Sequence, residues 1–102
     1  MFELTVEDSF SAAHQLLKSK TPCENLHGHN WRIKIYLRAE KLDTEVGWVM
    51  DFAQVKMFLK EVLARYDHKV LNEVMSVSPT AENIAKAIYQ DINKLTKVSK
   101  VS

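Results

Sequence analysis

Two stretches of alternating apolar and polar residues occupy most of the first forty positions. In the first stretch, the even positions from Phe2 to His14 carry the apolar side chains, and we expect a bulge near Asp8–Ser9. In the second, a charged or polar residue separates each pair of apolar ones: Trp31, Ile33, Ile35, Leu37 and Ala39. Side chains on a strand alternate between its two faces, so each stretch predicts a half-buried strand. The polar residues 15–26 between them are expected to form a loop.

The apolar spacing becomes helical after a short extended piece at Trp48–Met50. Asp51 is expected to cap the first helix, with Gln54 completing a capping box. Its apolar face follows at helical spacing: Val55, Phe58, Leu59, Val62, Leu63 and Tyr66.

A second helix is expected to start at Ser78-Pro79-Thr80, because proline suits the first helical turn. Its apolar face comprises Ala81, Ile84, Ala85, Ile88, Ile92 and Leu95. Val98 and Val101 then predict the start of another strand. This order of elements predicts an α+β fold, with an antiparallel sheet and two helices on one face.

Composition narrows the class of protein. The 102 residues are expected to form one domain, 1–102, and 46% hydrophobic and 26% charged residues are typical of globular chains. A net charge of +1 lacks the basic excess of nucleic-acid binders, so no nucleic-acid partner is expected. No apolar run approaches the roughly 20 residues that cross a bilayer, and the N-terminus lacks signal-peptide character. With a single cysteine, Cys23, these features indicate a cytoplasmic protein without a membrane partner. A chain this short leaves little interior for a deep pocket, which favours a site between subunits.

Three of the four histidines, His14, His27 and His29, lie at the ends of the two predicted strands. Each shares the parity of its strand's apolar face, so the three imidazoles converge if both faces form one side of one sheet. Three neutral imidazoles around Zn²⁺ leave the fourth position open for water or substrate, which is the catalytic pattern. The alternative is three histidines satisfied by the core or the sheet edge without a metal.

The remaining candidates are Cys23, four residues before His27, and the pair Asp67-His68. Cys23 has three open roles: fourth ligand of a structural Cys-His₃ zinc site, base or nucleophile, or plain buried cysteine. Asp67 could orient the His68 ring, which with Cys23 would make a relay of three side chains. A solvated loop or helix cap is the alternative for Asp67-His68.

Four motifs that span nearly the whole chain together resemble the 6-pyruvoyl-tetrahydropterin synthase family. In family order they are Phe10-Ser11-Ala12-Ala13-His14, Cys23-x₃-His27-Gly28-His29, Asp67-His68-Lys69-x-Leu71-Asn72 and Pro79-Thr80-x-Glu82-Asn83. The short gap between Cys23 and His27 is more similar to the bacterial 6-carboxy-tetrahydropterin branch of queuosine biosynthesis than to the animal pyruvoyl type.

The resemblance implies a fold, an assembly and a set of roles. The fold is the tunnelling fold (T-fold), assembled as a homohexamer, a dimer of trimers, with active sites between subunits. His14, His27 and His29 would bind zinc, Cys23 would be the proton acceptor, and His68 the relay acid/base oriented by Asp67. The implied reaction is that of a zinc-dependent lyase, which converts 7,8-dihydroneopterin triphosphate and water to 6-carboxy-5,6,7,8-tetrahydropterin, acetaldehyde and triphosphate.

Two other functions stay open at this stage. One is 6-pyruvoyl-tetrahydropterin synthase activity, an elimination of triphosphate without carbon–carbon cleavage. The other is a noncatalytic zinc module with Cys23 as the fourth ligand. The resemblance also implies a late glutamate on the last strand that anchors the pterin ring. The sequence stops at Val101-Ser102, so the last strand is expected to be truncated before that position, and Glu82 belongs to the helix-start motif instead.

Overall fold

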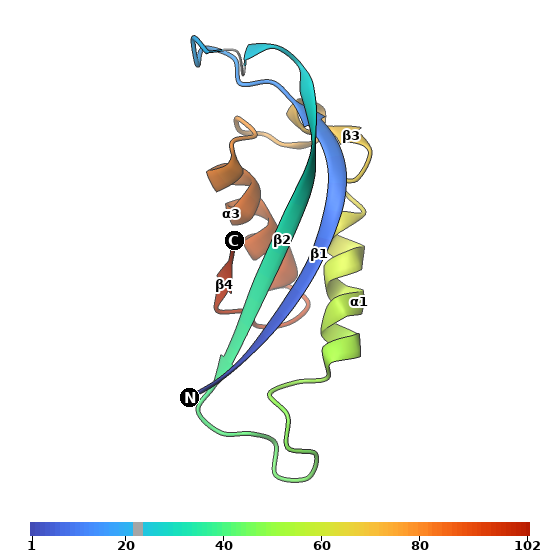
Figure 1. Cartoon of the computed structure of the whole chain (residues 1–102), viewed down its shortest axis with the longest axis vertical. Helices are drawn as coiled ribbons and strands as arrows, with labels where there is room; N and C mark the ends of the chain where they lie inside the picture. The colour runs from blue at the N-terminus through green and yellow to red at the C-terminus, as the bar shows by residue number, and fades with distance from the viewer. Residues whose placement is uncertain (22–23) are drawn as a thin grey trace.

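Two long paired strands run through the molecule, whose computed structural model describes residues 1–21 and 24–102. β1 (Phe2–His14) and β2 (His27–Ala39) pair antiparallel over their full lengths, from Phe2 opposite Ala39 to His14 opposite His27. The expected bulge near Asp8–Ser9 is wrong, because every position of β1 has a single partner on β2. The ribbon follows the long axis of the molecule, which extends 53 Å (Figure 1).

Two short strands complete the sheet, in the order β3-β1-β2-β4. β4 (Lys100–Val101) pairs antiparallel with β2, which confirms the strand predicted at this position. β3 (Lys69–Val70) pairs with β1 in the parallel direction, so the sheet is mixed and not antiparallel throughout. A strand of two residues has no alternation that a sequence pattern could reveal. The piece at Trp48–Met50 forms no strand within the described residues.

Two twelve-residue helices, α1 (Phe52–Leu63) and α3 (Ala81–Ile92), cover one face of the sheet (Figure 1). The even positions of β1 and the odd positions of β2 share that face and pack against them. The sheet contributes Val6, Phe10, Ile33, Ile35 and Leu37 to this core, α1 contributes Val55, Leu59, Val62 and Leu63, and α3 contributes Ile84, Ile88 and Ile92. The predicted α+β class is confirmed, with one further short helix, α2 (Leu71–Val74), that the sequence pattern did not indicate.

Side-chain caps determine where both long helices begin. The Asp51 carboxylate accepts a hydrogen bond from the Ala53 N–H at 2.9 Å, as predicted. Thr80 caps α3 by accepting from the Asn83 N–H at 3.1 Å. Pro79 therefore precedes the cap and does not lie in the first turn. Its carbonyl lies outside the hydrogen-bond ladder of the helix and is available to another element.

None of the helices in the described ranges combines the length and the hydrophobicity needed to span a membrane.

Candidate functional site

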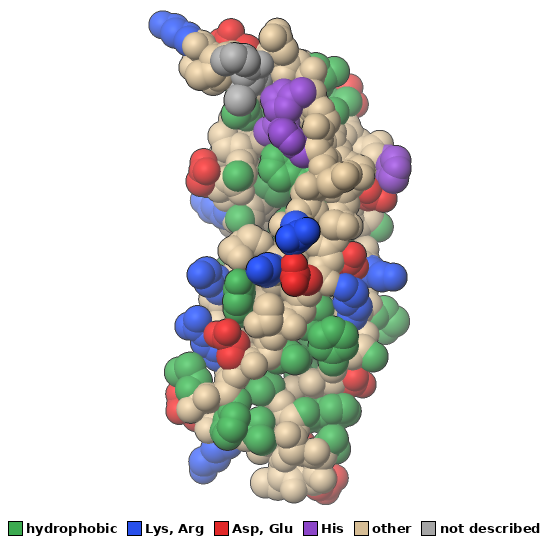
Figure 2. All heavy atoms as spheres, viewed as in Figure 1, with side chains coloured by type: hydrophobic (Ala, Val, Ile, Leu, Met, Phe, Trp, Pro, Cys, Tyr) green, Lys and Arg blue, Asp and Glu red, His purple; other side chains and the backbone are tan. Residues whose placement is uncertain are grey.

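The three histidines of the two long strands come together at one end of the β1–β2 ribbon. His14 and His27 are direct partners across the ladder, and His29 lies opposite Ala12. Each imidazole offers one nitrogen, and these three atoms lie within 4.8 Å of one another. Figure 2 shows histidine side chains gathered in one cluster in the upper part of the molecule, with another histidine apart from it at the edge. The convergence predicted from strand parity is therefore present.

Burial is graded across the cluster. His14 is buried at 4% exposure, His27 is half-buried and His29 is exposed. Partial desolvation and the neighbouring imidazoles of His27 and His14 lower the pKa of His29, which favours its neutral, ligating form. The cluster is thus anchored in the core on one side and open to solvent on the other, where a further ligand or substrate can approach.

Backbone carbonyls fix the tautomers of two of the rings. His14 Nδ1 lies 2.7 Å from the Pro79 carbonyl oxygen, and His27 Nδ1 lies 2.7 Å from the Asn25 carbonyl oxygen. A carbonyl oxygen only accepts, so each Nδ1 carries the proton and donates it. In the neutral rings both Nε2 atoms then present lone pairs, and these two atoms lie 3.0 Å apart.

Two facing lone pairs at that distance repel each other unless a cation lies between or beside them. Neutral imidazoles held by outer hydrogen bonds to carbonyls are the usual donors to Zn²⁺. The donor set formed by His14, His27 and His29 therefore fits a zinc ion, with the fourth position open.

Asp67 and His68 form a second constellation, held against the edge of β1. The Asp67 carboxylate accepts from the Ser11 N–H at 2.9 Å and from His68 Nδ1 at 2.9 Å. The His68 N–H in turn donates to the Ser11 carbonyl at 2.6 Å. The Ser11 N–H first, and then the His68 ring, hold the pKa of Asp67 below its usual range, so it stays ionised.

The His68 backbone adopts a left-handed conformation at φ 57°, which turns the chain from α1 into β3. Its side chain is 82% exposed. Because Asp67 accepts the Nδ1 proton, Nε2 is the ring nitrogen that can accept a proton from a substrate. The bonds to Ser11 therefore hold Asp67 and His68 against β1, and Asp67 orients the His68 ring. A simple solvated loop would lack these contacts.

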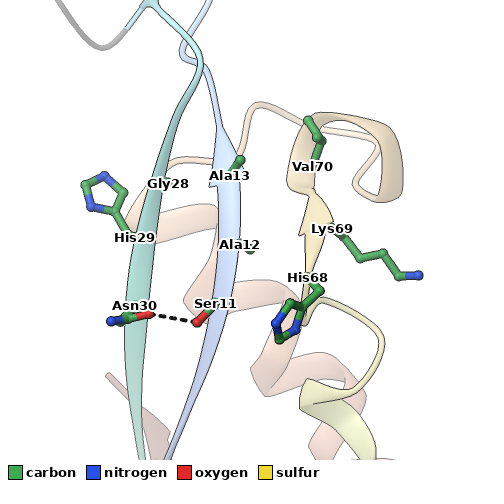
Figure 3. Close-up of a pocket in the computed structure, with 9 residues that line it drawn as sticks. All are labelled: Ser11, Ala12, Ala13, Gly28, His29, Asn30, His68, Lys69 and Val70. Carbon is green, nitrogen blue, oxygen red and sulfur yellow. Dashed lines mark hydrogen bonds between the residues drawn. The ribbon is translucent and has the colours of Figure 1, made fainter.

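The pair and the histidine cluster meet at one open cavity. His68 and His29 both line this cavity of about 530 Å³, together with Ser11, Asn30 and Gly28. The Ser11 hydroxyl donates to Asn30 Oδ1 at 2.7 Å across the ladder, on the face opposite the three histidines. In Figure 3, His29 and His68 point away from each other, with β1 and β2 between them. Cys23 lies outside the described residues.

Sequence reasoning missed the groups that support the cluster. The carbonyls of Pro79 and Asn25 are backbone groups, so a pattern of side-chain types does not predict their contacts. Asn72 was visible only as part of a motif. Its amide accepts from the Gln15 N–H and donates to the Gln15 carbonyl, both at 2.9 Å. These two bonds fix the backbone immediately after His14.

Comparisons with known proteins point to one family. The family model described as "6-pyruvoyl tetrahydropterin synthase" matches residues 3–102. The 6-carboxy-5,6,7,8-tetrahydropterin synthase of Synechocystis sp. is 37% identical over 99 residues, covering 92% of this chain and 77% of the relative. The dihydroneopterin monophosphate aldolase of Pyrococcus furiosus is 37% identical over 86 residues, covering 84% of this chain and 70% of the relative. The solved structure of Caenorhabditis elegans 6-pyruvoyl tetrahydropterin synthase superposes with a TM-score of 0.83 at 32% identity, covering 99% of this chain and 87% of that one.

Proposed function

This chain belongs to the 6-pyruvoyl tetrahydropterin synthase family and has its tunnelling fold, and we propose that it is a zinc-dependent carbon–carbon lyase. The substrate would be 7,8-dihydroneopterin triphosphate, converted with water to 6-carboxy-5,6,7,8-tetrahydropterin, acetaldehyde and triphosphate in queuosine biosynthesis. The observation that carries the proposal is the cluster of three imidazoles whose ligating nitrogens face one another. The relative named 6-carboxy-5,6,7,8-tetrahydropterin synthase supports this choice of reaction.

His14, His27 and His29 would hold the zinc ion. The Pro79 and Asn25 carbonyls keep the Nε2 atoms of His14 and His27 unprotonated and directed to the centre of the cluster. Bound zinc would supply Lewis acidity, which acidifies a substrate hydroxyl and stabilises negative charge on oxygen. The solvent-exposed side of the cluster, at His29, gives the substrate's side chain its approach.

Two groups would move protons. His68 would accept and return a proton at Nε2, because Asp67 holds the other ring nitrogen in its protonated form. Cys23, four residues before His27 in the sequence, would be the second proton acceptor. A thiol ionises more easily where a cation lies near it, which is the condition this role requires.

The two constellations point to an assembly. His68 and His29 line one cavity but point away from each other, with β1 and β2 between them (Figure 3), so we infer that one copy does not complete a relay by itself. We propose that Asp67 and His68 of one copy serve the cluster of a neighbouring copy, in a homohexamer built as a dimer of trimers. Light scattering of the parent chain would test the hexamer. An activity assay on a mixture of Asp67→Asn and His14→Ala chains would test the shared site, since mixed assemblies should regain part of the activity that each variant lacks alone.

The reaction is tested by incubating the zinc-loaded chain with 7,8-dihydroneopterin triphosphate and assaying acetaldehyde together with the pterin product. Formation of acetaldehyde and 6-carboxy-5,6,7,8-tetrahydropterin in equal amounts is the expected result. A chain that binds no zinc would refute the proposal. A chain that binds zinc stoichiometrically but releases another product would retain the site and change the reaction.

Two other reactions of this chemical class have support from particular relatives. The Pyrococcus furiosus relative supports an aldolase, which would release a phosphorylated aldehyde in place of acetaldehyde and triphosphate. The Caenorhabditis elegans structure supports elimination of triphosphate without carbon–carbon cleavage. The product assay separates all three when it is run with dihydroneopterin monophosphate as well as with the triphosphate.

A noncatalytic zinc module is the competing function outside this class. Cys23→Ala separates the two. Zinc retained with turnover lost supports a catalytic thiol, whereas zinc lost together with the thiol supports a structural Cys-His₃ site.

A further inference from the structure

His29 differs from the other two histidines of the cluster in how its ring is held. His14 and His27 each donate Nδ1–H to a backbone carbonyl. Within residues 1–21 and 24–102, the His29 ring makes no hydrogen bond. Metal-binding histidines usually depend on such an outer acceptor for their orientation. The orientation of His29 must therefore come from packing.

Trp31 provides that packing. The Trp31 and His29 ring centroids lie 5.1 Å apart at an interplanar angle of 74°, and those of Trp31 and His14 lie 4.9 Å apart at 89°. Both are edge-to-face contacts, the favourable arrangement for aromatic rings. The other ring neighbours of His29 in the described chain are His14 and His27, which are themselves part of the cluster. Trp31 is thus its one ring neighbour outside the donor set.

The indole is itself immobilised. Trp31 Nε1 donates to the carbonyl of Ala12 at 3.3 Å, and Ala12 is the ladder partner of His29. On its other side the indole stacks on Phe10, with centroids 6.3 Å apart and planes 18° apart. Phe10 is buried in the core. A fixed ring therefore connects the core to the exposed histidine.

We propose that Trp31 is the positioning residue for His29, taking the part that backbone carbonyls play for His14 and His27. The inference rests on the proposed function only in treating the three histidines as zinc ligands. Without the indole, the ring contacts left to His29 among the described residues are those with His14 and His27, the two rings with which it must bind the ion. Loss of an outer partner of a metal ligand lowers affinity about 10- to 100-fold.

The first test is zinc affinity by competition with a chromophoric chelator, for the parent chain and three variants. Trp31→Leu should weaken zinc binding about tenfold or more, whereas Trp31→Phe, which keeps a ring, should recover most of that loss. Trp48→Leu is the matched control, because Trp48 is the other tryptophan, is 42% exposed and has no ring contact to the cluster among the described residues. It should leave zinc binding unchanged. Unchanged affinity in Trp31→Leu, or equal weakening in Trp48→Leu, would overturn the proposal.

A second measurement does not require Trp31→Leu to fold. The chain has two tryptophans, and Trp48 is 42% exposed in the connection between β2 and α1. Trp48→Phe therefore leaves Trp31 as the only indole emitter. Zinc should change its fluorescence, with a midpoint at the independently measured Kd, since the imidazoles lie about 5 Å away. If bound zinc left the emission unchanged, the inference about Trp31 would be overturned and the proposed function would stand. If the parent chain did not bind zinc, both the proposed function and the inference would be refuted.

Discussion

The Asp67→Asn substitution tests the orientation of His68 with little change in shape. The Ser11 N–H requires an acceptor, so the new side chain must keep its oxygen there and turn its NH₂ group toward His68 Nδ1. Two donors then face each other. The His68 ring relieves this by moving its proton to Nε2, which leaves Nε2 unable to accept a proton from substrate.

The expected loss is that of a general acid/base group. Such groups contribute about 10²- to 10⁴-fold to turnover, so kcat should fall by that factor. Zinc affinity should not change, because the Asp67 carboxylate accepts from the Ser11 N–H and from His68 Nδ1 and from none of the three clustered histidines among the described residues. The depressed pKa of Asp67 means that its carboxylate stabilises the fold above the ordinary pKa of about 3.9 and loses this effect as pH falls through the lower, folded value. The stability of Asp67→Asn should therefore approach that of the parent in strong acid.

The assay measures kcat, KM and zinc stoichiometry side by side for the parent and two variants. Asp43→Asn is the matched control, since Asp43 is a loop aspartate whose carboxylate accepts two backbone N–H bonds at 2.9 Å, from Glu45 and Val46. Its activity should match the parent's. Undiminished kcat in Asp67→Asn, or an equal loss in Asp43→Asn, would refute the assignment of His68 as an oriented acid/base.

Three further outcomes follow from contacts outside that pair. Burial and the hydrogen bond from the Tyr66 hydroxyl to the Asp91 carboxylate raise the pKa of Tyr66, so stability should decline as pH rises above about 10, and urea unfolding of Tyr66→Phe should show a flatter decline. Asn72→Ala removes both bonds to Gln15 and should lower the free energy of unfolding by about 1–3 kcal/mol, measured with denaturant, while weakening zinc binding. Chelation of zinc should lower the melting temperature of the parent, and His14→Ala should abolish the difference between zinc-loaded and chelated samples.

The histidine cluster was predictable because it depends on strand parity alone. His27, His29 and Trp31 follow one another at intervals of two, so they share the apolar face of β2 whatever else the chain does. The cluster also required β1 and β2 to pair with their apolar faces on the same side. The apolar side chains at the even positions of β1, which include His14, are consistent with that pairing. The Asp51 cap was predictable because it is local, joining a side chain to an N–H two residues later. Thr80 caps α3 in the same local way, one residue after the Pro79 that was expected in the first turn.

What could not be predicted depends on contacts between distant parts of the chain. β3 is two residues long and is recognisable only by its pairing with Ala12 and Ala13. The carbonyl of Pro79 accepts from His14, which lies 65 positions earlier in the chain, and the residue types alone do not predict this contact. The position of His68 is likewise a matter of topology, because its N–H donates to the carbonyl of Ser11, 57 positions earlier in the chain. A shared motif does not reveal such a contact.

β1 and β2 pair without a break, so the two strands could in principle align in more than one register. The histidine cluster affects which register is the most stable. A shift by one position would turn one strand's apolar residues to water, so burial alone excludes it. A shift by two positions keeps every apolar side chain on the covered face, and burial discriminates against it only weakly. In one direction that shift brings His14 opposite Asn25 and places His29 four positions away from it, about 13 Å along the ribbon at roughly 3.3 Å per residue, too far to share one ion. An ion bound by all three histidines would therefore stabilise the native alignment against this misaligned hairpin during folding.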